Sequence, residues 1–243
     1  MTPPVIDSSG DPGEVWRVGY APDPWAWVPW EFAGDDGRFA GRWDDERAQY
    51  RSVYTSISLL GCLMELLAQL RTEAVTFGEL EEIEDDDEPA GLERPNPTFG
   101  TIAVDWLENR VYARAQQRGI YAEVTAASSI GVFTAAGIFA QFGIAPRGVD
   151  VALLKEPKNR SLTRTLSRWL FDQIGADRKP LYDGVAFRSR MGDDFRMWAV
   201  FERGSEEVSP LITPLTMPEP VTEDLSELRE AMEVLGLRWR EAL

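Results

Sequence analysis

One apolar segment constrains the fold most. Residues 57–70 (ISLLGCLMELLAQL) are apolar over the length of a helix, so the pattern predicts a helix there. Strand-like segments precede it at 15–20 (VWRVGY) and 52–55 (SVYT). Because strands and helices follow one another without strict βαβ alternation, the order of elements favours the α+β class.

The remaining elements follow from the same patterns. For the last helix we expect Thr222 as the cap and an end at Gly236. Two of the strands, 185–187 and 197–201, are expected to pair around a turn at 192–194. In all, we expect strands at 101–104, 119–125, 185–187 and 197–201, helices at 106–118, 161–173 and 223–235, and a loop over 23–41.

The expected organisation is a single domain over 14–243. Residues 1–13 are acidic and rich in Pro, Gly and Ser, which is typical of a disordered lead-in. Residues 79–97 form an acidic, proline-containing insert. Within it, residues 79–93 carry nine acids and no bases, and without them the net charge would change from −16 to −7. Much of the acidity is therefore local.

Residues 124–146 contain no charged side chain and have the length of a membrane span. They are weakly apolar, however, and include Thr, Ser and Gln. A buried strand followed by a helix of small residues fits them better than a membrane segment. Since the N-terminus has no signal-peptide pattern and Cys62 is the only cysteine, we expect a cytoplasmic protein.

The chain has no histidine, which excludes several kinds of chemistry. A Ser-His-Asp or Cys-His nucleophile, a histidine-ligated metal and a histidine proton shuttle are all ruled out. One cysteine excludes an internal disulfide and a CxxC site, and no metal site is expected. With 25 Lys and Arg against 41 Asp and Glu, direct nucleic-acid binding is not expected either.

Two charged residues stand inside apolar elements, where burial is costly without a partner or a role. Arg17 lies in the strand VWRVGY, and an outward-facing arginine on a half-exposed strand is the alternative. Glu65 interrupts the apolar helix beside small or polar neighbours, so a ligand or another backbone could approach there. The alternative is a solvent-facing stripe formed by Ser58, Gly61, Cys62, Glu65 and Gln69.

Three further residues are candidates for binding. Arg42, in GRW, could grip a phosphate with two parallel hydrogen bonds, or pair with a neighbouring aspartate. Tyr54 could stack on a flat ring, although core tyrosines are commoner. Ser189 follows the strand VAF and could orient a sugar or phosphate, or be a turn serine.

Taken in order, these segments resemble the RES-domain family, named for Arg, Glu and Ser. The resemblance spans about 15–202, and it departs from the family where Asp44 follows GRW, a place where Asn is frequent, and in the acidic insert. The matching segments are Arg17 in WRVG, Arg42 in GRW, Tyr54 and Ser56 followed by Glu65, LTRTLSRWLFD (162–172), DGVAFRSR (183–190) and MWAVFE (197–202).

The resemblance implies a fold like that of ADP-ribosyltransferase toxins, with small mixed sheets surrounded by helices. It implies degradation of NAD+ by phosphorolysis to ADP-ribose 1″-phosphate and nicotinamide, with inorganic phosphate as co-substrate and no cofactor. It also implies a toxin neutralised by an Xre-type antitoxin. By position, Arg17, Glu65 and Ser189 would be the catalytic residues, and Arg42 and Tyr54 would bind substrate.

This chemistry does not need histidine. Cleaving the bond between nicotinamide and ribose develops an oxocarbenium-like centre, and nicotinamide leaves as a neutral molecule. A carboxylate near the positive charge and arginines on the phosphates are what such a reaction uses. Two alternatives stay open: transfer of ADP-ribose to a protein or small-molecule acceptor, and a catalytically silent interaction protein with the same fold.

Overall fold

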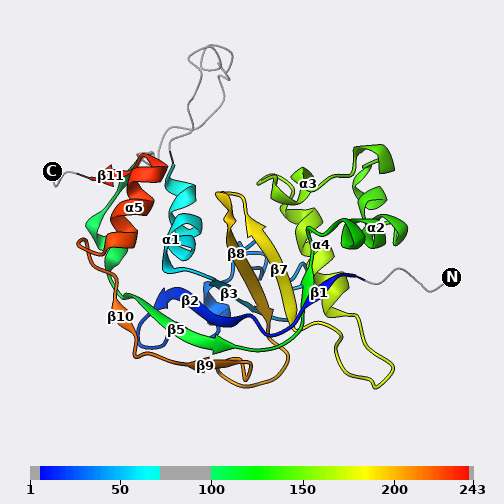
Figure 1. Cartoon of the computed structure of the whole chain (residues 1–243), viewed down its shortest axis with the longest axis horizontal. Helices are drawn as coiled ribbons and strands as arrows, with labels where there is room; N and C mark the ends of the chain where they lie inside the picture. Colours follow the sequence, from blue (N-terminus) through cyan, green and yellow to red (C-terminus); the bar gives the residue numbers. More distant parts are fainter. Residues whose placement is uncertain (1–5, 72–99, 241–243) are drawn as a thin grey trace, which may run out of the picture.

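The computed structural model describes residues 6–71 and 100–240, which form a mixed α and β fold around a large, mostly antiparallel sheet (Figure 1). In chain order the strands and α-helices are β1 (Ser8–Ser9), β2 (Gly13–Tyr20), β3 (Ser52–Ser56), α1 (Leu59–Leu67), β4 (Thr101–Ile102), β5 (Arg110–Gln117), β6 (Tyr121–Glu123), α2 (Ala127–Ala135), α3 (Ala152–Lys155), α4 (Arg160–Phe171), β7 (Gly184–Ser189), β8 (Gly192–Phe201), β9 (Ile212–Pro214), β10 (Glu219–Pro220), α5 (Ser226–Leu235) and β11 (Arg238–Trp239).

The sheet is larger than the small mixed sheets that we expected. In the described ranges, nine strands join in the order β1-β6-β7-β8-β3-β2-β5-β10, with β9 on β5. Only β6 and β7 pair in parallel within this sheet. The sheet extends so far because β5 pairs with β2 along the whole of both strands. A separate parallel pair joins β4 and β11.

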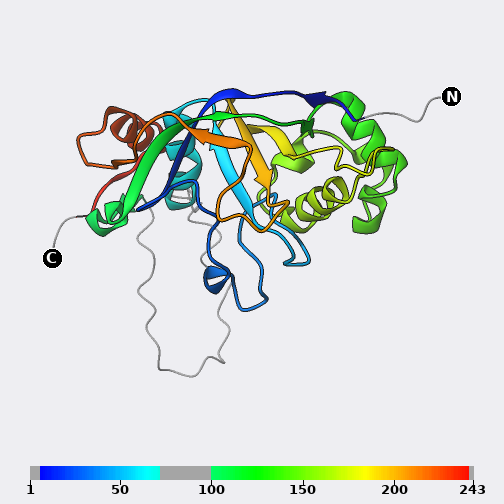
Figure 2. The ribbon, with the colours of Figure 1, turned by 90° about the horizontal axis from the view of Figure 1, so that it is seen from below.

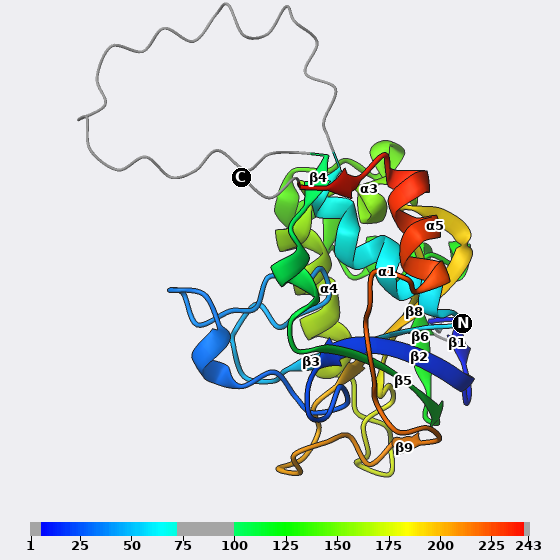
Figure 3. The same ribbon diagram turned by 90° about the vertical axis from the view of Figure 1, so that its left-hand side faces the viewer.

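Two groups of helices lie at opposite ends of this sheet (Figures 1 and 2). Helices α1 and α5 pack side by side at one end (Figure 3), where Leu63, Leu67 and Leu228 are buried. Helices α2, α3 and α4 gather at the other end, around Phe133 and Leu166. A third cluster of buried side chains comprises Val15, Trp25, Trp27, Val53, Ala113, Ala115, Tyr121, Ala186, Trp198, Val200 and Ile212.

The apolar segment forms the helix expected of it. Helix α1 begins after Ser58, whose hydroxyl accepts a hydrogen bond from the Gly61 amide at 3.1 Å and so caps the first turn. A 3₁₀ turn, Ala68–Leu70, continues it. The strands near 15–20 and 52–55 and the helix near 161–173 are confirmed as β2, β3 and α4.

The helix predicted at 106–118 is wrong. A short 3₁₀ helix, Val104–Leu107, is followed by β5. Ala113, Ala115 and Gln117 are buried in alternation with more exposed neighbours, which is the period of a strand. Ala, Arg and Gln are strong helix formers, so local propensity favoured a helix, but pairing with β2 outweighs it.

The expected disorder over 1–13 is also corrected for the part that the structure describes. Ser8 and Ser9 pair with β6, the Asp7 carbonyl accepts from the Glu123 amide at 2.8 Å, and Ile6 is buried. One apolar side chain and a sheet edge with free hydrogen-bonding groups are enough to order this stretch. The acidic insert, 79–97, lies outside the described residues.

Three boundaries differ from expectation. The connection between β7 and β8 falls at Arg190 and Met191, before the expected turn at 192–194. Helix α5 begins at Ser226 and not at 223, and the Thr222 hydroxyl donates to Asp224 and caps no helix. Gly236 ends it in a left-handed conformation, as expected, with φ of 68°.

The uncharged segment 124–146 follows β6 and contains α2 and a 3₁₀ helix, Phe139–Phe142. Phe133 and Phe139 are buried in the core, and several of the small residues around them face outward. Within 6–71 and 100–240, no helix has the length and apolar character to cross a bilayer.

Candidate functional site

A carboxylate and a hydroxyl meet where α1 approaches the end of β7. The Ser189 hydroxyl donates to Glu65 Oε1 at 2.5 Å and accepts from the Met191 amide at 2.8 Å. Ser189 is 1% exposed, while Glu65 is half-buried. The hydroxyl thus holds one carboxylate oxygen in place, and Oε2 makes no hydrogen bond to any described residue.

The small residues of α1 set its distance from the sheet. A Cβ on Gly61 would lie 2.3 Å from the Ser56 hydroxyl, so only glycine lets the helix come this close to β3. Gly61 and Cys62 are buried. The solvent-facing stripe considered for this helix is therefore wrong for these two residues, and Glu65 follows one turn later on the same face.

Arg17 is buried, with 9% of its surface exposed, where β2 separates from β3. Its Nε donates to the Pro24 carbonyl, and its Nη1 donates to the Tyr54 carbonyl at 2.9 Å. No described carboxylate forms an ion pair with it. Burial lowers the pKa of Arg17 to about 10. The outward-facing alternative for Arg17 is thus wrong.

Tyr54 is anchored through its hydroxyl. The group donates to Asp44 Oδ1 at 3.0 Å and accepts from the Trp43 amide at 2.9 Å. Burial, and then the charge of Asp44, raises the pKa of Tyr54 well above its ordinary value. The phenol therefore stays protonated at neutral pH and holds the segment that carries Arg42 against β3.

Arg42 reaches from this segment to α3. Its Nη1 donates to the Leu154 carbonyl at 2.6 Å and its Nη2 donates to the Lys155 carbonyl at 3.0 Å. These carbonyls belong to the last turn of α3, where no intrahelical donor is available. No described carboxylate pairs with Arg42, so the alternative considered for it, a surface ion pair with a neighbouring aspartate, does not form.

Hydrogen bonds join the five predicted residues into two groups. Ser189 holds Glu65, whereas Tyr54 accepts from Arg17 through its carbonyl and anchors the segment of Arg42 through its hydroxyl. Burial is the largest influence on Arg42 and lowers its pKa, which the charge of Glu65 opposes. Tyr54 acts electrostatically on both Arg42 and Arg17.

The burial of Asp44 was not predicted from the sequence. The residue is 4% exposed, and its Oδ2 accepts from the Gly41 amide at 2.5 Å while Oδ1 accepts from Tyr54. Burial raises the pKa of Asp44. Both oxygens are thus used to fold the GRW loop onto Tyr54. The signal available in the sequence was the position of Asp44 directly after the GRW motif. From the sequence, Asp44 was considered as a surface partner of Arg42.

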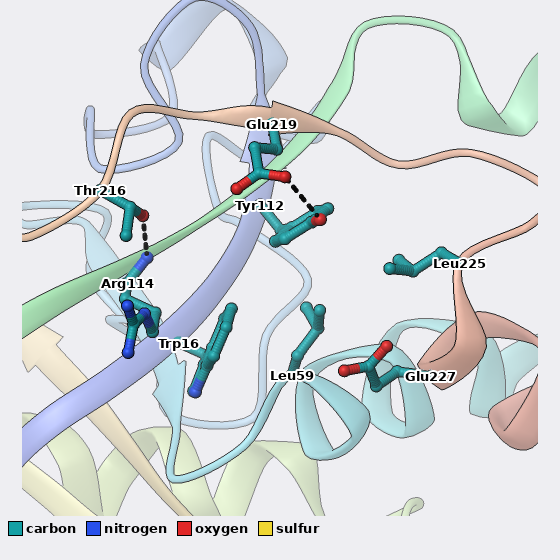
Figure 4. Close-up of a pocket in the computed structure, with 8 residues that line it drawn as sticks. All are labelled: Trp16, Leu59, Tyr112, Arg114, Thr216, Glu219, Leu225 and Glu227. Atoms are coloured by element: carbon teal, nitrogen blue, oxygen red, sulfur yellow. Dashed lines mark hydrogen bonds between the residues drawn. The ribbon is translucent and has the colours of Figure 1, made fainter.

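A cavity of about 340 Å³ lies apart from these residues, between β2, β5, β10 and the first turns of α1 and α5 (Figure 4). Trp16 and Tyr112 form one wall, with ring centroids 6.2 Å apart. Since Trp16 points away from Arg17 along β2, this cavity contains none of the five predicted residues. Across the described ranges, no group of acidic or cysteine side chains could hold a metal ion.

Comparison with known proteins adds little to this geometry. No model of a protein family matches the sequence, and no curated protein matches it. A solved structure, the crystal structure of the M. tuberculosis MbcT–MbcA toxin–antitoxin complex, matches over 93% of this chain and 92% of that chain. Sequence identity is 12% and the TM-score is 0.43, too low for this match to support an argument about function.

Proposed function

We propose that this protein is an enzyme that degrades NAD+ by cleaving the bond between nicotinamide and ribose. The observation that carries the proposal is the half-buried carboxylate of Glu65, which the Ser189 hydroxyl holds and whose charge acts on Arg42. The reaction suits a site without histidine, because the leaving group departs as a neutral molecule and needs no acid. The resemblance to the RES-domain family motivates the choice of substrate.

Each residue has a role in this proposal. Glu65 stabilises the positive charge that develops at the anomeric carbon and positions the ribose hydroxyls. Ser189 orients Glu65 and can donate to the ribose or to a phosphate. Tyr54 packs against the nicotinamide ring. Arg17 and Arg42 bind phosphate groups.

Both arginines retain donors for such a ligand. Arg17 Nη2 and Arg42 Nε make no hydrogen bond to the described residues. The other two nitrogens of each guanidinium group donate to main-chain carbonyls. Those carbonyl bonds fix the guanidinium groups in place. A fixed cation loses little conformational freedom when an anion binds, which favours phosphate binding at this site.

The bond changes are simple. The carbon–nitrogen bond between ribose and nicotinamide breaks, and its electron pair leaves with the nitrogen, so nicotinamide departs neutral. An oxygen of inorganic phosphate then forms a bond to the anomeric carbon, which gives ADP-ribose 1″-phosphate. Phosphorolysis is the finer part of the proposal, and water or another acceptor would give ADP-ribose or an ADP-ribosylated product instead.

The deciding experiment incubates purified protein with NAD+, with and without phosphate, and identifies products by mass spectrometry. Glu65→Gln keeps an oxygen that can accept from Ser189 but removes the charge, so we expect at least a roughly 100-fold loss of turnover. Glu230→Gln, at an exposed position of α5, is the matched control. Wild-type turnover in Glu65→Gln would refute the assignment.

The same assay separates the alternatives. If the label of labelled NAD+ appears on a protein or another acceptor, the reaction is ADP-ribosyl transfer and not phosphorolysis. A protein that neither binds nor consumes NAD+ would be the silent interaction protein.

We further propose that the protein acts as a toxin with an Xre-type antitoxin as partner. Expression in bacteria should stop growth and deplete NAD+, and the Glu65→Gln variant should do neither. Co-expression of a small Xre-type protein that is encoded beside this one should restore growth. Growth arrest by the Glu65→Gln variant, at equal protein level, would separate toxicity from NAD+ consumption and contradict the link between them.

A further inference from the structure

A second cavity, of about 380 Å³, lies at the beginning of α4 and is lined mostly by arginines. Its lining residues are Arg38, Glu46, Arg47, Ser161 and Arg164, none of which belongs to the site of Glu65. Three cations and one anion give the lining a net charge of +2. This stands out in a chain whose net charge is −16.

Main-chain contacts hold two of the arginines. Arg164 donates from Nε to the Gly41 carbonyl at 3.2 Å and from Nη2 to the Phe39 carbonyl. Arg38 donates from Nε to the Glu46 carbonyl at 2.5 Å. Arg164 Nη1 and Arg38 Nη2 bond to none of the described residues. The guanidinium groups are therefore positioned before any ligand arrives, and each keeps donors free.

Two acidic groups, Glu46 and Asp36, offset part of this charge and leave an excess of one positive charge. The Glu46 carboxylate accepts from the Thr165 hydroxyl at 2.5 Å, and it forms an ion pair with Arg47 Nε at 3.8 Å without a hydrogen bond. Asp36, which does not line the cavity, pairs with Arg38 at 3.2 Å, and both side chains are about half exposed. Neither Arg47 nor Arg164 hydrogen-bonds to a described carboxylate.

Ser161 adds a hydroxyl donor and the first turn of α4 to the same cavity. The amides of a helix's first turn carry partial positive charge, and this turn has no side-chain cap. Arginine forks with a hydroxyl beside them match the oxygens of a phosphate group. The volume is near the small end of the range for ligand pockets, which suits one or two phosphate groups with little else.

We infer that this cavity is a second anion site, which binds a phosphate-bearing small molecule through Arg38, Arg47 and Arg164. The inference does not depend on the proposed NAD+ chemistry. Free diphosphate and the diphosphate of a nucleotide share the chemistry that the cavity recognises.

Titration calorimetry with pyrophosphate tests the inference, with ADP and succinate in parallel. We expect saturable binding of pyrophosphate and no binding of succinate. ADP binding tighter than pyrophosphate would identify a nucleotide as the ligand, and ADP binding equal to or weaker than pyrophosphate would identify free diphosphate. Absence of saturable pyrophosphate binding, or equal binding of succinate, would overturn the inference.

Variants place the binding in this cavity. Arg47 is exposed, and its ion pair with Glu46 is long, at 3.8 Å, so Arg47→Gln should leave the fold intact and weaken pyrophosphate binding roughly tenfold. Arg229→Gln on α5, at the other end of the sheet, is the matched control and should change nothing. Equal weakening in both variants would indicate a general charge effect and reject the cavity.

One more variant separates this site from that of the proposed function. Arg42→Gln removes a phosphate ligand of the NAD+ site, and pyrophosphate binding that survives in it belongs to the second cavity. Loss of binding in Arg42→Gln but not in Arg47→Gln would reject the second site and support the first. Failure of NAD+ turnover in the wild type would leave the pyrophosphate result unaffected.

Discussion

Arg17 illustrates how a single cation can shape its surroundings without an ion pair. Its guanidinium connects the Pro24 and Tyr54 carbonyls, and so ties the chain after β2 to β3. The strand pattern of VWRVGY could predict that Arg17 faces away from Trp16 and Val18. It could not predict burial, because that depends on where β2 and β3 separate.

Arg17→Lys should lower the free energy of unfolding by about 1–3 kcal/mol, because an ammonium group cannot reach both carbonyls and leaves one buried acceptor unpaired. Urea denaturation followed by tryptophan fluorescence would measure it. Arg229→Lys, at an exposed position, is the control and should change stability little. Equal stability of Arg17→Lys and wild type would show that the carbonyl contacts contribute nothing.

Cys62 is buried, and burial raises the pKa of its thiol to about 12. The thiolate is the reactive form, so alkylation of the native protein should be slow and should still rise about tenfold per pH unit between pH 8 and 10. In the unfolded chain, the rate should level off near the ordinary thiol pKa of about 8.5. Iodoacetamide labelling with mass spectrometry would compare the two.

The raised thiol pKa also makes the stability of the folded state depend on pH. The folded state holds the proton to higher pH than the unfolded state does, so this group's contribution is complete below about pH 8.5 and declines as pH rises toward 12. A plateau in the native labelling rate near pH 9 would contradict the pKa shift. Cys62→Ala, which has no thiol, reports any background labelling.

At the scale of elements, prediction succeeded where pattern and tertiary context agree. The apolar run of α1 and the alternation in β2 each match their burial, and both were found from sequence. β5 was missed because its side chains favour a helix locally while its partners, β2 and β9, lie elsewhere in the chain. Likewise, no local pattern places Arg42 against the Leu154 carbonyl, 112 residues away.

Two helical glycines offer a matched test of how α1 is seated. Gly61→Ala should destabilise the protein by about 1–3 kcal/mol and reduce NAD+ turnover, since its Cβ would lie 2.3 Å from Ser56 Oγ and push Glu65 away. Gly131→Ala in α2, where nothing lies within 4 Å of the added Cβ, should stabilise by about 0.5–1 kcal/mol. Thermal denaturation of both variants would measure these changes in stability. A Gly61→Ala variant as stable as the wild type would contradict the tight packing.

At the scale of the whole molecule, a net charge of −16 acts against the compact state through self-repulsion. Raising ionic strength from about 0.01 M to 0.15 M shortens the Debye length from about 30 Å to 8 Å. The melting temperature should therefore rise, and scanning calorimetry would record it. Sodium and potassium chloride should act alike, and a falling melting temperature would show that attractive pairs dominate instead.

The composition and element order sufficed to place the chain among mixed α and β folds, but not to predict one nine-stranded sheet among the described residues. Sheet size depends on which strands pair, and the pairing of β2 with β5 joins segments about 100 residues apart. The local hydrophobic period of a sequence carries little information about such long-range pairings.

The ends of that sheet bear on how the protein behaves in a crowded solution. The sheet ends at β1 on one side, and on the other side β9 and β10 both pair with β5. β1 and β10 have two residues each, and β9 has three. β10 contains Glu219 and Pro220, and proline cannot donate to an incoming strand. Short, charged or proline-containing borders offer a second copy almost no template for strand addition. A truncation that removed Ser8 and Ser9 would uncover β6 and invite fibrous association.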